Sequence, residues 1–186
     1  MNTLIIANVW SDKEIEKVEI LNDRFFPNFR IVTNMDIGFG TVWKVPDSSK
    51  NTVEWTKRFL RKFMETKSFD ILLKIDPDIT IKSVPEMPVD CDIAGDFRIS
   101  PVGWIWFGGC QYYTKNAVAR ILADPLYIGK SHFQDAELAK SVKRLNLRAY
   151  NMSEVDMWGD DDSMAEMFHP RRTSMKRLPS GIIMLD

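Results

Sequence analysis

The sequence has few cysteines, no long apolar run and almost no excess charge. Its two cysteines, Cys91 and Cys110, are too few for a disulfide scaffold or a four-cysteine metal site. No apolar run approaches the ~18 residues that a membrane-spanning helix needs. Residues 1–9 lack the basic region and the small-residue cleavage site of a signal peptide. We therefore expect a reduced, cytoplasmic protein that does not associate with membranes.

Positive and negative charges nearly balance, with 25 Lys and Arg against 26 Asp and Glu and a net charge of −1. The overall charge therefore gives this chain no general attraction to nucleic acid or anionic lipid, although the sequence still allows a local basic patch. The chain has 186 residues, of which 45% are hydrophobic and 27% charged. This length and composition are typical of one globular domain with its own core, so we expect a single domain over 1–186.

The order of apolar segments predicts an α/β fold. Thr3–Val9 is a continuous apolar run, typical of a strand buried on both faces. A helical pattern follows and ends before Pro27, and Phe29–Thr33 reads as a second strand. A second helix begins at residue 51 or 52, and a third strand covers 69–75. The order β-α-β-α-β predicts a Rossmann-like domain with a mostly parallel central sheet flanked by helices.

The second half of the sequence is less regular. Two further strands are expected at 93–97 and 104–107, and two helices at 116–122 and 135–145. The second of these strands is expected to end in a turn at Gly108 and Gly109. The end of the chain, 171–186, begins with a basic segment at 171–177 and is expected to form an exposed tail.

Two carboxylates come directly after the third strand. Asp76 and Asp78 flank Pro77, which lacks a backbone donor and stiffens the turn between them. In open α/β sheets, ligands bind beyond the carboxyl ends of the strands. Two carboxylates placed there can hold a hard divalent cation with a diphosphate on its far side. The same residues also suit an ordinary Asp-Pro turn with a solvated second carboxylate, and the motif alone does not decide between the two readings.

Four further motifs follow this pair in a fixed order. They are an apolar strand ending at Gly108 and Gly109, a Tyr-Thr-Lys segment at 113–115 beside a helix start, the pair Gln134 and Asp135 at another helix start, and the isolated His169. In this order, the segment 69–169 resembles the GT-A glycosyltransferases, which transfer a sugar from a nucleotide-sugar donor. That family usually has an acidic pair where this sequence has Gln134 and Asp135.

The resemblance implies a divalent metal site. Asp78 would be a direct ligand, and Asp76 would contact the ribose or reach the metal through water. His169 would be the second protein ligand, with the donor diphosphate supplying further oxygens to Mn²⁺ or Mg²⁺. A histidine before a proline, such as His169, can equally be a surface residue.

The resemblance also implies a donor pocket at the end of the first strand. Asn8, Trp10 and Asp12 would hold the nucleotide base and ribose, with Trp10 stacked on the base. Trp10 could equally be a core aromatic residue. Gly108 and Gly109 would let the sugar approach the backbone closely, since glycine has no Cβ, or they would simply form a turn.

Asp135 is the candidate catalytic residue. At a helix start it would face the acceptor, which we expect to be a glycan or a modified DNA base. If the reaction inverts the anomeric centre, one carboxylate must take the acceptor proton, and Asp135 is the candidate base. If the reaction retains it, Asp135 would position a substrate. Residues 1 to about 80 would then form the half of the domain that binds the donor, and residues from about 81 to 170 the half that binds the acceptor.

A second enzyme class also matches the carboxylate pair. The segment from Asp76 resembles the nucleophile motif of haloacid-dehalogenase-like, Mg-dependent phosphatases. Asp76 would then attack phosphorus, Asp78 would be the general acid and base, 160–161 would bind Mg²⁺ and Lys143 would bind phosphate. Two observations count against it, because two strand–helix units precede Asp76 and the segment 154–158 does not make the expected apolar strand.

A third possibility is a non-catalytic module that binds nucleotide or nucleic acid. Lys140, Lys143 and Arg144 are spaced to share one helix face, and Arg148 and the basic segment 171–177 follow them. Such a face is usually only solvated. It could instead guide a polyanionic acceptor, and strong salt dependence of DNA binding would then be expected.

Overall fold

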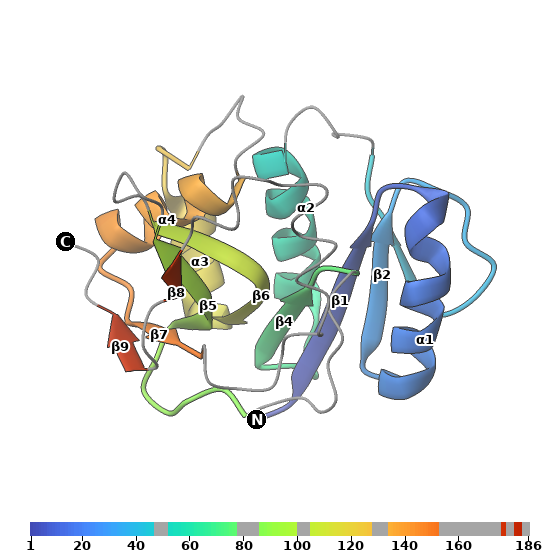
Figure 1. The fold of residues 1–186 in the computed structure, drawn as a ribbon, viewed down its shortest axis with the longest axis horizontal. Coiled ribbons are helices and arrows are strands. Elements are labelled where there is room, and N and C mark those ends of the chain that lie inside the picture. The colour runs from blue at the N-terminus through green and yellow to red at the C-terminus, as the bar shows by residue number, and fades with distance from the viewer. Residues whose placement is uncertain are drawn as a thin grey trace.

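The computed structural model describes residues 1–46, 52–77, 86–99, 105–127, 134–152, 176–177 and 181–183. Figure 1 shows how the elements follow one another along the chain. In the first part they are β1 (Thr3–Val9), the 3-10 helix η1 (Asp12–Glu14), α1 (Ile15–Phe25), β2 (Phe29–Thr33), β3 (Val42–Lys44), α2 (Thr52–Glu65) and β4 (Ile71–Ile75). In the second part they are β5 (Ile93–Ile99), β6 (Ile105–Thr114), α3 (Lys115–Ala123), α4 (Gln134–Arg144), β7 (Ala149–Asn151), β8 (Lys176–Arg177) and β9 (Gly181–Ile183).

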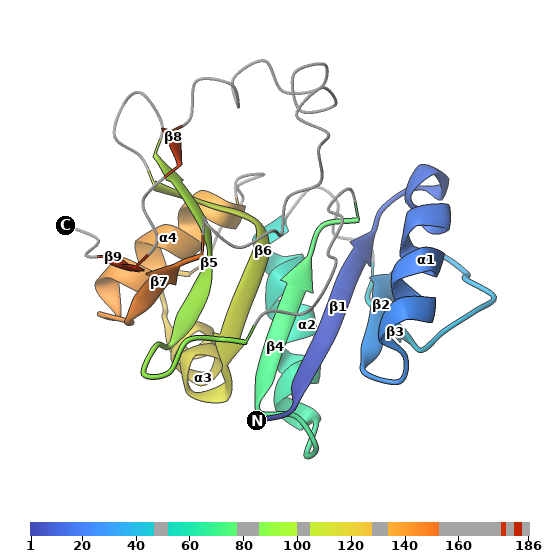
Figure 2. The same cartoon turned by 60° about the horizontal axis from the view of Figure 1, so that its bottom comes forward.

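Within the described ranges, nine strands form one sheet in the order β3-β2-β1-β4-β6-β5-β7-β9, with β8 paired to β5 (Figure 2). The strands β3, β2, β1 and β4 are mutually parallel, as the order β-α-β-α-β predicts. β6 runs antiparallel between β4 and β5, and β7 returns parallel to β5. The predicted α/β, Rossmann-like class is therefore confirmed, and its parallel core lies in the N-terminal half.

The helices cover both faces of the sheet. The side chains of β1 accordingly alternate between two apolar clusters, one on each face. Ile5, Ala7 and Val9 face the cluster that includes α1, while Leu4 and Ile6 face the cluster formed with α2, α3 and α4. This alternation explains why residues 4–7 and 9 of β1 are all apolar, since each of these side chains is removed from water on one face or the other. The side chains at the even-numbered positions of β1 and β4 thus point toward α2 and α4.

The strand predicted to stop at the two glycines continues through them. β6 runs from Ile105 to Thr114 because it is paired on both sides, to β4 and to β5. Its register with β5 shifts at this point, so that residues 108–110 lie opposite the single residue 96. A bulge of this kind is a common place for glycine inside a strand. The prediction of a turn at Gly108 and Gly109 is therefore wrong.

The exposed tail predicted for the C-terminal segment is also wrong where the structure describes it. Arg177 of β8 pairs antiparallel with Arg98 of β5, and β9 pairs antiparallel with β7. These short strands form hydrogen bonds with backbone groups at the edges of the sheet. Such pairing involves the backbone, so the pattern of side chains in the sequence gives little indication of it. The rest of the basic segment, 171–175, lies outside the described residues.

Among the described helices, none is both long enough and apolar enough to cross a bilayer.

Candidate functional site

The ends of β1 and β4 meet at a topological switch point of the sheet. From β1 the chain passes through α1 to β2 on one side, whereas α2 leads to β4 on the other side of β1. In open α/β sheets, such a point leaves a crevice beyond the carboxyl ends of the two strands. The register places Ala7 opposite Ile75, so Asn8 and Asp76 follow at neighbouring positions of the adjacent strands. Two of the predicted donor-site residues are thus brought together.

Asn8 is held by a tryptophan that the sequence did not single out. Its side chain is buried, and its Oδ1 accepts a hydrogen bond of 3.2 Å from Nε1 of Trp55 in α2. Because an indole N–H can only donate, this bond fixes the orientation of the amide. The Nδ2 donors of Asn8 are consequently turned away from Trp55.

Trp10 is packed on the same tryptophan and is not a core residue. The ring centroids of Trp10 and Trp55 are 3.9 Å apart, with an angle of 34° between their planes. Trp55 is buried, whereas Trp10 remains 37% exposed. Glu14 fixes the adjoining backbone, since its Oε2 accepts hydrogen bonds from the N–H groups of Trp10 and Ser11 at 2.6 and 3.1 Å. Trp10 therefore presents a supported aromatic ring at the carboxyl end of β1.

Asp12, the third residue predicted to hold the nucleotide, is less closely connected. It lies in η1, directly after β1, and its side chain is exposed. Among the described residues, no hydrogen bond or ion pair joins it to Asn8 or Asp76. The structure thus places Asp12 near the end of β1 without building it into the cluster.

A buried lysine lies beside Asp76, and its charge is also influenced by Asp135. Lys74 lies in β4 opposite Gln111 of β6, it is only 4% exposed, and its ammonium forms an ion pair with Asp76. Burial by itself lowers the pKa of Lys74, but the negative charges of Asp76 and Asp135 outweigh it and the pKa is raised. Lys74 is therefore a permanent positive charge inside the site. Its signal in the sequence was a single charge within an otherwise apolar strand, two residues before Asp76.

Asp135 reaches the same cluster from the first turn of α4. Its Oδ1 accepts a hydrogen bond of 3.1 Å from Nε2 of Gln111, and the Oε1 of Gln111 accepts one from the hydroxyl of Tyr113. Burial raises the pKa of Tyr113 well above its ordinary value, so this hydroxyl stays protonated and donates. The donor direction along the chain Tyr113–Gln111–Asp135 is thereby fixed. Gln134, which stands where an acidic residue was expected, begins α4 and is half-buried.

The bulge in β6 contacts the site through its backbone. The N–H of Asp76 donates a hydrogen bond of 2.8 Å to the carbonyl of Gly109. Gly108 lies beside it within β6. The two predicted glycines therefore adjoin the end of β4 at Asp76, although they lie within a strand and not in a turn.

The described carboxylates near Lys74 do not by themselves make a metal site. Asp76 is paired with Lys74 and Asp135 with Gln111, although carboxylate oxygens are the ligands that Mg²⁺ and Mn²⁺ prefer. Asp78 and His169, the predicted direct ligands, lie outside the described residues, as do residues 160–161. In the part of the chain that is described, no group of three or more His, Cys, Asp or Glu side chains could hold a metal ion. Both cysteines are buried, and neither forms a disulfide.

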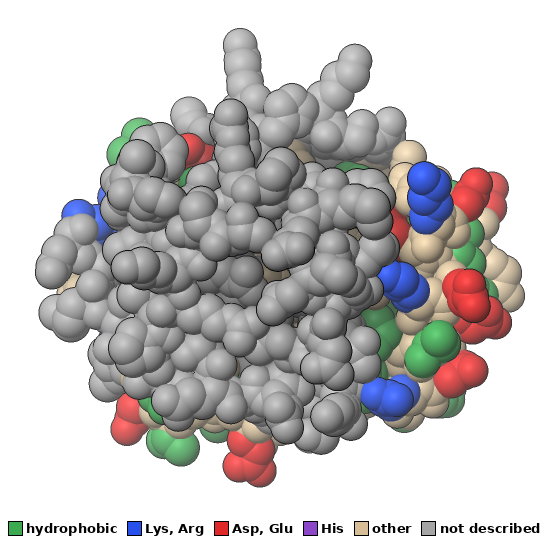
Figure 3. Space-filling model, in the orientation of Figure 1, with side chains coloured by type: hydrophobic (Ala, Val, Ile, Leu, Met, Phe, Trp, Pro, Cys, Tyr) green, Lys and Arg blue, Asp and Glu red, His purple; other side chains and the backbone are tan. Residues whose placement is uncertain are grey.

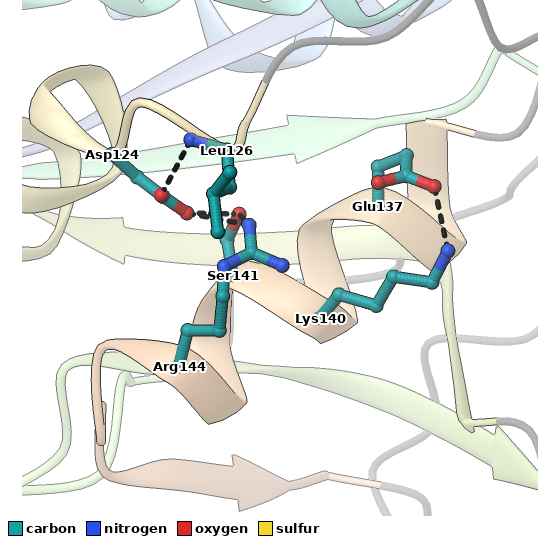
Figure 4. Close-up of polar contacts among 6 residues, drawn as sticks. All are labelled: Asp124, Leu126, Glu137, Lys140, Ser141 and Arg144. Carbon is teal, nitrogen blue, oxygen red and sulfur yellow. Dashed lines mark hydrogen bonds and ion pairs between the residues drawn. The ribbon is translucent and has the colours of Figure 1, made fainter.

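The basic residues of α4 are largely matched by acidic partners, as Figure 4 shows. Lys140 pairs with Glu137 at 2.7 Å, and Arg144 pairs with Asp124 at 2.6 Å. Arg148 lies 3.9 Å from Asp92. Lys143 is exposed in the last turn of α4, about 12 Å along the helix axis from Asp135, since each residue adds ~1.5 Å. This distance places Lys143 far from the carboxylate cluster that a phosphate-binding lysine would need to approach.

Acidic and basic side chains also lie together on the side of the molecule that carries α1. Over α1, at the right of Figure 3, acidic and basic side chains lie next to one another with apolar ones between them. Glu16 and Arg24 belong to this helix. The described part of this face thus mixes the two signs.

Comparisons with known proteins give a fold and no family. No family model matches the chain, and no curated protein matches it. Among solved structures, the chain is similar to A197 from STIV, with a TM-score of 0.56 and 13% sequence identity over 82% of each chain. At this identity the likeness concerns the fold alone, and it agrees with the α/β architecture described above.

Proposed function

We propose that this protein is a metal-dependent glycosyltransferase, which transfers a sugar from a nucleoside diphosphate sugar to an acceptor hydroxyl. One observation carries the proposal: Asp76 is ion-paired with the buried Lys74 at the switch point of the sheet, and the negative charge of Asp135, 59 positions away in the sequence, acts on the same lysine. This is also where proteins of this fold class bind their ligands. The acceptor is proposed to be a glycan or a modified DNA base, and the setting to be the cytoplasm.

In this proposal the end of β1 holds the nucleotide. The exposed ring of Trp10 stacks on the base, supported from behind by Trp55. The amide of Asn8, oriented by Trp55, offers its Nδ2 donors to oxygen acceptors of the base or ribose. Asp76 accepts hydrogen bonds from the ribose or binds the metal through water.

The reaction needs charge stabilisation and a proton acceptor. Cleavage of the sugar–phosphate bond leaves negative charge on the departing diphosphate. Asp78 and His169, together with the diphosphate, would hold a divalent ion that would stabilise this charge. Asp135, oriented by Gln111, takes the proton of the acceptor hydroxyl if the anomeric centre is inverted. If the centre is retained, Asp135 positions the acceptor or the donor sugar.

A thermal-shift panel of nucleoside diphosphates and nucleotide sugars, each with Mn²⁺ and with EDTA, tests the proposal. A ligand that binds only the folded state raises the melting temperature. We expect a shift with one nucleotide family that disappears in EDTA and in Asp78→Asn. A shift only with Mg²⁺ and beryllium fluoride would instead indicate a phosphatase. Absence of any response to nucleotide or phosphate mimic would leave the binding module as the better reading.

A further inference from the structure

Lys57 is a buried lysine that has no counter-ion among the described residues. It lies near the start of α2, its side chain is only 9% exposed, and its ammonium is 5.5 Å from the centre of the Tyr127 ring. Glu54, one turn earlier in the same helix, pairs with Arg58 and Arg61 instead. Because a buried charge without a partner is costly, packing alone does not explain this lysine.

Two neutral donors beside Lys57 also lack a partner. The hydroxyl of Tyr127 and the Nε2 atom of Gln134 are both buried, and within the described part of the chain neither has a hydrogen-bond partner. Burial raises the pKa of Tyr127, and the charge of Asp135 raises it further, so the hydroxyl keeps its proton. The Gln134 side chain is close enough to influence the same pKa, so the two donors are neighbours.

The acidic side chains in the first turn of α4 are already engaged. Asp135 accepts a hydrogen bond from Gln111, and its charge acts on the buried Lys74. Glu137 pairs with Lys140 at 2.7 Å. Their negative charges are therefore offset by other groups, and the described residues where α2 packs on α4 retain an excess of donors and one unpaired positive charge.

We propose that Lys57, Tyr127 and Gln134 form a binding site for an oxyanion, a phosphate or carboxylate group, between α2 and the first turn of α4. The three side chains supply an ammonium, a hydroxyl and an amide donor, and an oxyanion has enough lone pairs to accept from all of them. The backbone N–H groups at the start of α4, which have no partner within the helix, add to the attraction. A neutral ligand would leave the Lys57 charge uncompensated.

The position of this site indicates which molecules bring the anion. Gln134 directly precedes Asp135, the candidate base, so the anionic group would belong to the transferred sugar or to the acceptor. This assignment rests on the proposed function, whereas the oxyanion site itself does not. Two sources share the required chemistry, a sugar that carries a carboxylate and a substrate that carries a phosphate.

The probes are inorganic phosphate and glucuronate, titrated by calorimetry at constant ionic strength with chloride as the balancing anion, and glucose is the neutral control. Lys57→Met removes the charge and keeps a long side chain, Lys57→Arg keeps the charge, and Tyr127→Phe removes only the hydroxyl. Lys62→Met is the matched control, because it removes a lysine charge from the same helix about 7.5 Å further along its axis. Thermal unfolding verifies that each variant is folded.

We expect the wild type and Lys62→Met to bind one of the two anions equally well, and neither to bind glucose. Lys57→Met and Tyr127→Phe should bind that anion at least about tenfold more weakly, the scale of one hydrogen bond to a charged group. Lys57→Arg should keep most of the affinity. The anion that binds more tightly identifies the source. Absence of anion binding by the wild type, or equal binding by all variants, would overturn the proposal.

The stability of the ligand-free protein separates a binding role of Tyr127 from a structural one. A buried hydroxyl without a partner costs free energy, so in chloride alone Tyr127→Phe should unfold at the same temperature as the wild type or at a higher one. A hydroxyl that stabilised the fold would lower this temperature on removal. A lower melting temperature together with unchanged anion affinity would show that Tyr127 is only structural.

The oxyanion site and the proposed function can fail separately. If anion binding depends on Lys57 and Tyr127 but no nucleotide changes the melting temperature, the site stands and the proposed function is wrong. If a nucleotide binds in a metal-dependent way but no anion binding depends on Lys57, the proposed function stands and the oxyanion site is wrong.

Discussion

The Nε2 atom of Gln111 lies 3.1 Å from Oδ1 of Asp135, and this hydrogen bond joins the middle of the sheet to the first turn of α4. Gln111 in turn is the cross-strand neighbour of Lys74. The candidate base and the carboxylate after β4 are therefore parts of one polar cluster. Because Lys74, Gln111 and Tyr113 are buried members of this cluster, each of them is sensitive to the loss of its partner.

Replacement of Asp135 tests the catalytic role. In Asp135→Asn the amide cannot take a proton, and we expect kcat to fall by about 10²–10⁴-fold, the usual contribution of a general base. Donor affinity, measured by titration with the responding nucleotide and Mn²⁺, should stay close to that of the wild type. Glu137→Gln is the control, since Glu137 is on the same helix but pairs with Lys140. A parallel loss of donor affinity in Asp135→Asn would assign Asp135 to the donor pocket instead.

Removal of the Tyr113 hydroxyl tests the chain of donors behind Asp135. Tyr113→Phe leaves the buried Oε1 of Gln111 without this donor, so we expect the free energy of unfolding to fall by about 1–2 kcal/mol. Loss of this donor should weaken the orientation of the Gln111 amide, and with it the hydrogen bond to Asp135, so we expect turnover to fall. Urea unfolding and turnover are the two measurements. Unchanged turnover in a destabilised variant would restrict Tyr113 to a structural role.

The two stacked tryptophans should respond differently to truncation. Trp55→Ala removes a fully buried side chain and should cost about 3–5 kcal/mol of stability. Trp10→Ala removes a partly exposed ring and should cost only about 1 kcal/mol, the value of its stacking on Trp55. We expect Trp10→Ala to abolish the nucleotide-dependent thermal shift, while Trp10→Phe should keep part of it. A full shift in Trp10→Ala would show that the base binds elsewhere.

Asp124 should make stability depend on pH at the acidic end. It ends α3 and accepts hydrogen bonds from Ser141 and Arg144 of α4 and from the N–H of Leu126 (Figure 4). Burial raises the pKa of Asp124, but the bonds from Arg144, Leu126 and Ser141 outweigh it and the pKa is lowered. The stabilisation is therefore complete above the unfolded pKa of about 3.9 and is lost as the pH falls through the lower folded value.

Asp124→Asn measures this contribution. At neutral pH the variant should be about 1–3 kcal/mol less stable than the wild type, because a buried charged pair loses one partner. The difference should narrow as the pH falls below about 4, since protonation removes the same charge from the wild type. Urea unfolding of both proteins over this range is the test. A difference that does not change with pH would mean that the Asp124 charge does not contribute.

Local signals in the sequence account for much of the fold. The apolar run at Thr3–Val9 and the helix beginning at residue 52 are confirmed, because burial on both faces and helical periodicity are properties of neighbouring residues. The short strands β3, β7, β8 and β9 were not predicted, since two or three residues cannot display an alternating pattern. The continuation of β6 through its glycines was missed for a related reason, because pairing on both sides holds the strand through the bulge.

The sequence by itself determined the α/β class, the position of Asp76 at a strand end and the position of Asp135 at a helix start. These follow from hydrophobic periodicity and helix-start signals, which act over a few residues. Only the tertiary structure decided that Lys74 pairs with Asp76 within the electrostatic influence of Asp135, that Gln111 hydrogen-bonds Asp135 and that Trp55 contacts both Asn8 and Trp10. These relationships depend on the antiparallel insertion of β6 beside β4 and on the packing of α2 and α4 over one face of the sheet. Such contacts join distant parts of the chain, and no local pattern encodes them.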